Sequence, residues 1–194
     1  MTKNLRQNLH EFTQDKEILD IERIGFVYLE DKPLRFYSDL TYICVKVGIP
    51  DSKCQKYIEI EHAAADVGDE GVKFVFALIV RLTDDIKFTD DDDTDIVSCT
   101  SSIEREVLLF PEGKNVIDDI IFHGLKEIED GIVCGALEII SGENIIFFDP
   151  ITFDGTLVGG MAKKLDWQEN FKFHNDGKLP HATSLYEKNH SEEL

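Results

Sequence analysis

Residues 72–82 constrain the fold most strongly, because this segment is apolar on both faces of a possible strand. All its even-numbered residues are apolar, and Val75, Ala77 and Ile79 form a second apolar set between them. Successive side chains of a strand point to opposite faces of its sheet. A strand with two apolar faces is typically central and covered on both sides. We therefore expect residues 72–82 to be the core strand of the fold.

Comparable short runs of apolar, β-branched and aromatic residues recur along the chain, and turn-forming residues separate them. The further strands predicted in this way cover residues 24–29, 40–47, 57–62, 96–110, 132–140, 144–148 and 151–157. In 57–62 two isoleucines alternate with Glu59 and Glu61, which indicates a half-buried strand with one wet face. The strands do not alternate regularly with helices. This order favours an antiparallel sheet, a sandwich or a barrel over a doubly wound fold.

Two segments have the spacing of helices, so the predicted fold class is α+β and mostly β. Residues 4–23 carry apolar side chains at loose helical intervals, which predicts an N-terminal helix. Residues 115–130 carry four isoleucines and one leucine on a single helical stripe, with Asn115 as a cap and Gly131 as a stop. Residues 167–173, which contain three aromatic residues, are expected to form a last strand or to cap the core.

The chain divides into three predicted parts. Residues 1–23 form the N-terminal helical segment, and residues 24–173 form a single β-rich domain. Residues 174–194 are polar and have no periodic apolar residues, which predicts a flexible tail. A chain of 194 residues with 42% hydrophobic residues is long enough to bury a core of its own.

The net charge of −19 restricts the partners that the chain can take. Nucleic acids require lysine and arginine to displace their counterions, and anionic lipid surfaces attract basic proteins. We therefore expect no nucleic-acid partner and no membrane partner. A basic protein would be steered toward such a surface. The alternative is that the acidity only keeps the protein in solution.

The cysteines and the apolar runs point to a cytoplasmic protein. Four cysteines are scattered without a Cys-x-x-Cys motif, although a disulfide between Cys44 and Cys54 stays open. Residues 1–20 lack the apolar centre of a signal peptide. The longest uncharged apolar run, 74–80, is too short to span a membrane.

Residues 84–95 hold seven aspartates in twelve positions and are predicted to form an exposed, mobile loop. The candidate partner-binding residues are Asp84, Asp85, Asp90, Asp91, Asp92, Asp93 and Asp95. A calcium-binding EF-hand loop that started at Asp91 would need glycine at Ile96 and glutamate at Ser102. We predict no specific metal site here, although weak calcium binding by so dense a cluster stays open.

No catalytic motif passes a check of its spacing, so we predict no catalytic residue and no cofactor. Residues 155–160 have the glycine spacing of a phosphate-binding loop, but Met161 and Ala162 follow where lysine and serine or threonine are required. His181 and Thr183 match half of a two-histidine phosphoesterase motif, and the second half is absent from the sequence.

Three hypotheses of function remain open. The first is a non-catalytic acidic binding module, inhibitor-like or immunity-like, that acts on a basic protein partner. The second is a self-assembling structural subunit of a ring, a tube or a virion-type assembly. The third is a metal-dependent hydrolase whose carboxylates, such as Glu138, Asp149 and Asp154, meet only in the fold.

Overall fold

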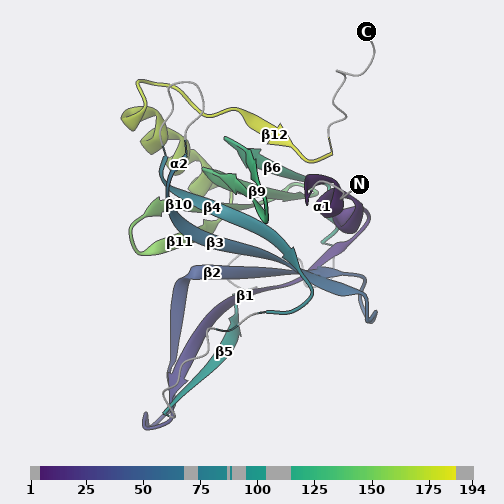
Figure 1. Cartoon of the computed structure of the whole chain (residues 1–194), viewed down its shortest axis with the longest axis vertical. Coiled ribbons are helices and arrows are strands. Elements are labelled where there is room, and N and C mark those ends of the chain that lie inside the picture. Colours follow the sequence, from purple (N-terminus) through teal and green to yellow (C-terminus); the bar gives the residue numbers. More distant parts are fainter. Residues whose placement is uncertain (1–4, 68–73, 87, 89–94, 104–114, 187–194) are drawn as a thin grey trace.

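The computed structural model describes residues 5–67, 74–86, 88, 95–103 and 115–186, and it consists of two packed antiparallel sheets (Figure 1). In spatial order, the larger sheet contains β5 (Ile96–Ser102), β1 (Glu17–Tyr28), β2 (Phe36–Gly48), β3 (Gln55–Val67), β4 (Phe74–Thr83), β8 (Gly131–Cys134) and β7 (Lys126–Ile128). The smaller sheet contains β11 (Gly155–Gly159), β10 (Asn144–Thr152), β9 (Ala136–Ser141), β6 (Asp119–His123) and β12 (Ala182–Ser184). This architecture confirms the predicted mostly β, antiparallel fold, in the form of a sandwich.

The core lies between the two sheets, where alternating side chains of each strand point inward. The larger sheet contributes Ile21, Ile43, Val45, Ile58, Ile60, Leu78 and Val80, and the smaller sheet contributes Ile120, Phe122, Leu137, Ile139, Ile146 and Phe148. The predicted core strand corresponds to β4, which lies inside the larger sheet between β3 and β8. Its second face is only partly covered, because Ala77 is buried whereas Val75 is 74% exposed.

The helix predicted over residues 115–130 is wrong, because the structure places β6 and β7 there. Ile120 and Phe122 are buried at a spacing of two, which is the period of a strand. Gly124 has a positive φ of 71° and makes the turn that separates the two strands. Isoleucine is β-branched and favours strands, so this apolar stripe fits a sheet as well as a helix.

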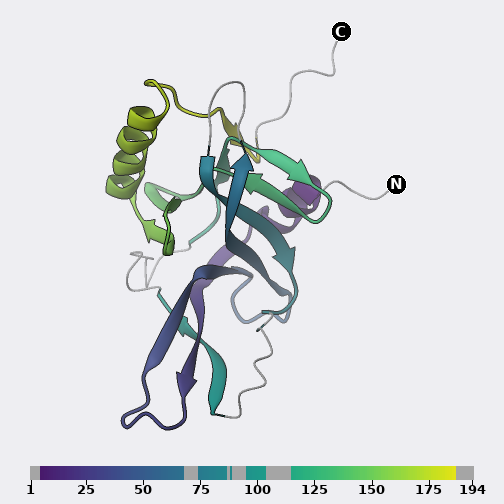
Figure 2. The same cartoon turned by 60° about the vertical axis from the view of Figure 1, so that its left-hand side comes forward.

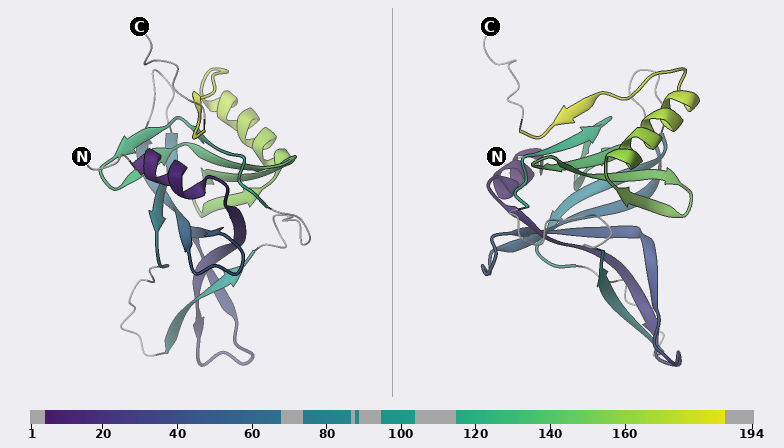
Figure 3. Two further views of the ribbon diagram at one scale, coloured as in Figure 1. Left: turned by 90° about the vertical axis from the view of Figure 1, so that its right-hand side faces the viewer. Right: turned by 180° about the vertical axis from the view of Figure 1, so that it is seen from behind.

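The second helix of the fold is α2 (Met161–His174), which covers the outer face of the smaller sheet (Figure 3). Trp167 and Phe171 are four residues apart, lie on one face of α2 and pack on Phe147 of β10. The aromatic segment 167–173 therefore caps the smaller sheet and is not a strand. Phe173, on another face of the helix, is exposed.

Both ends of the chain differ from the prediction. The N-terminal helix α1 (Leu5–Thr13) is shorter than 4–23, since Asp15 has a positive φ of 57° and β1 starts at Glu17. The flexible tail predicted from residue 174 is wrong for residues 182–186. There, β12 pairs with β6, Leu185 is buried, and the Tyr186 hydroxyl donates to Thr13 Oγ1 at 2.8 Å. Residues 187–194 lie outside the described residues.

A three-stranded arm projects from the sandwich (Figures 1 and 2). We use "the arm" for residues 25–39 and 96–99. It comprises the far ends of β1 and β2 with their connection, and the part of β5 that pairs with residues 25–28 of β1. The β1–β2 register is irregular between Arg23 and Gly25, where the arm leaves the sandwich. Only glycine fits at position 25, because an added Cβ would lie 2.2 Å from the carbonyl oxygen of Tyr37.

Candidate functional site: an acidic pocket at the base of the arm

The outer face of the larger sheet is hollowed where the arm meets the sandwich. This pocket has a volume of about 440 Å³, and we call it the acidic pocket. It is lined by Ile24, Asp39, Tyr42, Glu59, Glu61, Arg81, Phe88 and Asp130. Four carboxylates therefore face one guanidinium group in a pocket that also has two aromatic residues in its wall.

Strand alternation and register bring these residues together. Ile58 and Ile60 of β3 are buried in the core, so Glu59 and Glu61 point to the opposite face, as the sequence predicts. Arg81 of β4 lies directly across from Glu59, and Tyr42 of β2 lies directly across from Glu61. Cross-strand neighbours on one face are close enough for their side chains to interact.

Arg81 is held by the carboxylates around it. One of its terminal nitrogens donates to Glu59 Oε1 at 3.1 Å and to Glu61 Oε2 at 2.5 Å. Its Nε lies 3.8 Å from Asp130 Oδ2, at the outer rim of the pocket. Partial burial would lower the pKa of Arg81, but hydrogen bonds and charges from Glu61 and Glu59 outweigh burial and raise it. The pocket is thus arranged to hold a planar cation.

Two further polar groups, Tyr42 in the pocket wall and Cys44 beside it, have raised pKa values. Partial burial, followed by the charge and hydrogen bond of Glu61, raises the pKa of the Tyr42 hydroxyl. Burial, reinforced by Glu59 and Glu22, raises the pKa of the adjacent Cys44 thiol to about 12. A nucleophilic cysteine needs a lowered pKa. Cys44 is therefore not activated as a nucleophile.

The aspartate-rich stretch 84–95 borders the pocket through Phe88. Asp84 Oδ1 lies 2.7 Å from Lys56 Nζ, and the Asp84 side chain is largely exposed. Asp85 and Asp95 are also exposed. The predicted partner-binding residues Asp90, Asp91, Asp92 and Asp93 lie outside the described residues. The structure thus places one residue of this stretch in the pocket wall, and sequence reasoning did not select Asp39, Arg81 or Asp130.

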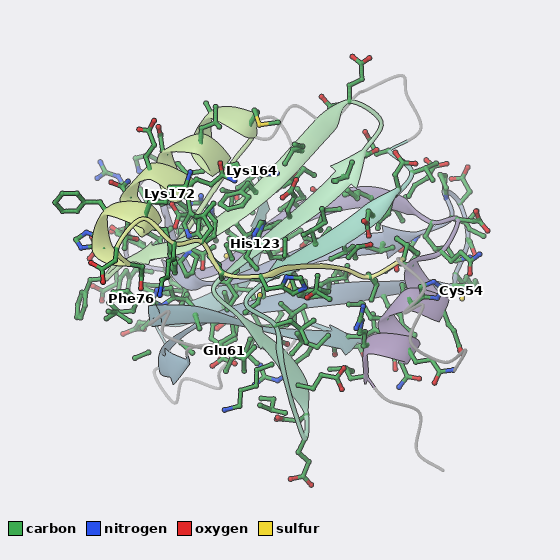
Figure 4. The ribbon with its side chains drawn as sticks, turned by 90° about the horizontal axis from the view of Figure 1, so that it is seen from above. Cys54, Glu61, Phe76, His123, Lys164 and Lys172 are labelled. Carbon is green, nitrogen blue, oxygen red and sulfur yellow. The ribbon has the colours of Figure 1, made fainter. Side chains whose placement is uncertain are left out.

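A second polar cluster lies beneath α2, on the outer face of the smaller sheet (Figure 4). Glu138 of β9 is buried and lies 3.2 Å from His123 Nε2, and its other oxygen accepts from Lys164 Nζ at 2.7 Å. Burial would raise the pKa of Glu138, but hydrogen bonds from His123 and Lys164 outweigh burial and lower it. Trp167 and Phe147 pack against the His123 ring. This arrangement ties α2 to the sheet and leaves little access for a ligand.

Replacing Glu138 with glutamine should destabilise the fold by about 1.5–3 kcal/mol, because hydrogen bonds to charged groups contribute that much. Since the folded-state pKa of Glu138 is lowered, its ionised form stabilises the fold above the unfolded-state pKa, which is about 4.3. The difference between wild type and variant in urea unfolding should therefore shrink as pH falls below about 4. The control is Glu143→Gln at an exposed turn, expected within about 0.5 kcal/mol of wild type at neutral pH.

The other candidate carboxylates, Asp149 and Asp154, lie on β10 and in the turn that follows it. Asp149 is buried and Asp154 is exposed at the β10–β11 turn. Within the part of the chain that the structure describes, no group of three or more His, Cys, Asp or Glu side chains is arranged to hold a metal ion.

Cys44 and Cys54, for which a disulfide was left open, are both free thiols. Among the described residues, no helix is both long and apolar enough to cross a membrane.

Comparisons with family models, with curated proteins and with solved structures give no match for this chain. Proposals for its function therefore rest on its own geometry and charge.

Proposed function

We propose that the protein is a non-catalytic, acidic binding module that captures a basic protein partner through the acidic pocket. The observation that carries this proposal is the cation site itself: two carboxylates of β3, Glu59 and Glu61, and one of the β7–β8 turn, Asp130, converge on the Arg81 guanidinium. A surface with charge complementary to its partner gives both fast association and selectivity. The net charge of −19 extends the same attraction over the whole molecule.

The pocket retains acidic capacity for an incoming side chain after Arg81 is paired. Asp39 on β2 and Asp130 in the β7–β8 turn both line the pocket, and the Asp130 side chain is 73% exposed. Asp39 Oδ1 accepts from the backbone nitrogen of Thr41 at 2.8 Å, which fixes the orientation of the carboxylate. Arg81 alone does not neutralise the four carboxylates of the pocket. An arginine or lysine of a partner would neutralise part of the remaining negative charge. The aspartate-rich stretch 84–95 would add attraction at the rim.

Self-assembly is the second candidate, because β5 lies at the edge of the larger sheet in the described part of the chain. An edge strand offers backbone donors and acceptors to a neighbouring molecule. The charge of −19 opposes contact between copies, however, and so it favours a basic partner over a second copy.

The double variant Asp39→Asn/Asp130→Asn should bind a fluorescein-labelled nona-arginine peptide about fivefold more weakly than wild type, because partly exposed ion pairs contribute roughly 0.2–1 kcal/mol each. Fluorescence anisotropy at two salt concentrations measures this affinity. The matched control is Glu143→Gln/Asp176→Asn, which removes the same charge from two exposed turns away from the pocket.

The control variant should bind within twofold of wild type. Equal weakening in both double variants would mean that the peptide responds to total charge and not to the pocket, and the proposed function would then be wrong. The proposed function would also be wrong if the wild-type protein failed to bind the peptide at low salt.

A further inference from the structure

An exposed aromatic cluster on the arm continues the face on which the acidic pocket lies. The β1–β5 register is continuous from Glu22 to Tyr28, so Ile24, Phe26 and Tyr28 point to the same side of β1. Ile24 lines the pocket. Tyr37 of β2 pairs with Phe26 and joins the same face. The pocket and the cluster therefore lie on the same face of β1.

The three rings contact one another and stay accessible. The Phe26 and Tyr37 rings are stacked at 5.6 Å, and the Tyr28 ring meets each of them edge-on at 5.4 Å. Tyr28 and Tyr37 are each 39% exposed. Leu29 and Leu34, in the connection at the tip of the arm, are also exposed. Exposed tyrosines that converge in this way are typical of the energetic centre of a protein interface.

A carboxylate stands beside the aromatic cluster. The Tyr37 hydroxyl donates to Asp31 Oδ2 at 3.0 Å, which places a negative charge at the edge of the rings. An aromatic face and a carboxylate together attract a cation, and arginine suits both because its planar guanidinium stacks on rings and pairs with carboxylates. The arm thus has a carboxylate that can attract a cation, as the pocket does, together with aromatic rings on which a guanidinium can stack.

We propose that the aromatic face of the arm, formed by Phe26, Tyr28 and Tyr37, binds one arginine of the basic partner. A second arginine, before or after the first in the partner's sequence, enters the acidic pocket. This inference rests on the proposed function and names the partner chemistry as an extended segment with two arginines. Ile24 and Tyr28 are four residues apart on β1, or about 13 Å in an extended strand. Two arginines four residues apart in an extended segment span the same distance and point to the same side.

Three fluorescein-labelled peptides of equal length and charge, built on Gly and Ser, test this inference. The first carries two arginines four residues apart, the second carries two adjacent arginines, and the third carries two lysines four residues apart. Wild-type protein should bind the first peptide about fivefold more tightly than the other two. The variant Tyr28→Leu/Tyr37→Leu keeps apolar side chains but removes two of the three rings, so that Phe26 has no aromatic neighbour on this face; it should lose most of this preference and bind the three peptides with similar affinity. Tyr37→Phe, which retains the ring, should keep most of the preference.

The control is Phe173→Leu, which removes an exposed ring from α2 and should leave all three affinities unchanged. If the tyrosine variant keeps the wild-type preference while Asp39→Asn/Asp130→Asn weakens binding, the proposed function stands and this inference is wrong. If wild type binds none of the peptides at low salt, both are wrong. Sedimentation that shows a wild-type dimer lost in the tyrosine variant would make a second copy the occupant of the arm and would also overturn the inference.

Discussion

Phe148→Ala is expected to destabilise the protein by about 3–5 kcal/mol, as truncation of a fully buried phenylalanine does in other cores. Phe148 is 0% exposed and points from β10 into the core between the two sheets. The loss combines the transfer free energy of the ring with the cavity that remains after incomplete relaxation of its neighbours. The free energy of unfolding from urea titration measures this effect.

Phe153 provides the matched control, because it is the same residue type five positions along the chain and is 85% exposed. Phe153→Ala should change the free energy of unfolding by less than about 1 kcal/mol, since the side chain is largely exposed and approaches the Phe76 ring edge-on. Similar losses for Phe148→Ala and Phe153→Ala would contradict the placement of Phe148 in the core and of Phe153 in the exposed β10–β11 turn.

A chain that ends at Pro180 is expected to be less stable than a chain that ends at Tyr186 by more than about 3 kcal/mol. The shorter chain lacks β12, which pairs with β6, and the buried side chain of Leu185. It also lacks the hydrogen bond from Arg6 to the Ser184 carbonyl oxygen at 2.7 Å, which links the two ends of the chain. Thermal and urea unfolding of the two chains isolate the contribution of residues 181–186.

The substitution Leu185→Ala in the full chain separates packing from chain length. It should cost about 2–5 kcal/mol by the same mechanism as other buried leucine truncations. Equal stability of the two shortened chains, together with a neutral Leu185→Ala, would restore the expectation of a loose C-terminal tail.

The sequence was informative where a strand period is long and strict. The strict alternation in residues 57–62 predicted the observed arrangement, in which Ile58 and Ile60 are buried and Glu59 and Glu61 point outward. The sequence misled where two periods fit. In residues 115–130 the isoleucines satisfy a helical spacing, but their β-branched side chains and Gly124 support two short strands.

The position of α2 was missed because both sides of this helix carry apolar residues. Trp167 and Phe171 are buried against the smaller sheet, whereas Met161, Leu165 and Phe173 are exposed on other sides of the helix. A helix of this kind has little contrast between its faces, so its period does not stand out in the sequence. The strand β12 was missed because three residues are too few to show any period.

The acidic pocket could be predicted only in part. The alternation around Glu59 and Glu61 indicated a polar sheet face, and that signal came from neighbouring residues of one strand. Asp39 and Asp130 join them from 20 or more residues away through strand pairing and a turn, which no local pattern contains. The aspartate-rich stretch 84–95 was conspicuous in composition, yet Phe88 is its one described residue in the pocket wall.

The central claim is that the acidic pocket is the place where a cationic partner binds. Titration of isotope-labelled protein with nona-arginine, followed by backbone amide chemical shifts, locates that place directly. We expect the largest shifts at Tyr42, Glu61, Arg81 and Asp130, with small shifts at the exposed acidic turns that contain Glu143 and Asp176. Shifts of equal size over all acidic surfaces, or a maximum at Glu143 or Asp176, would contradict the account.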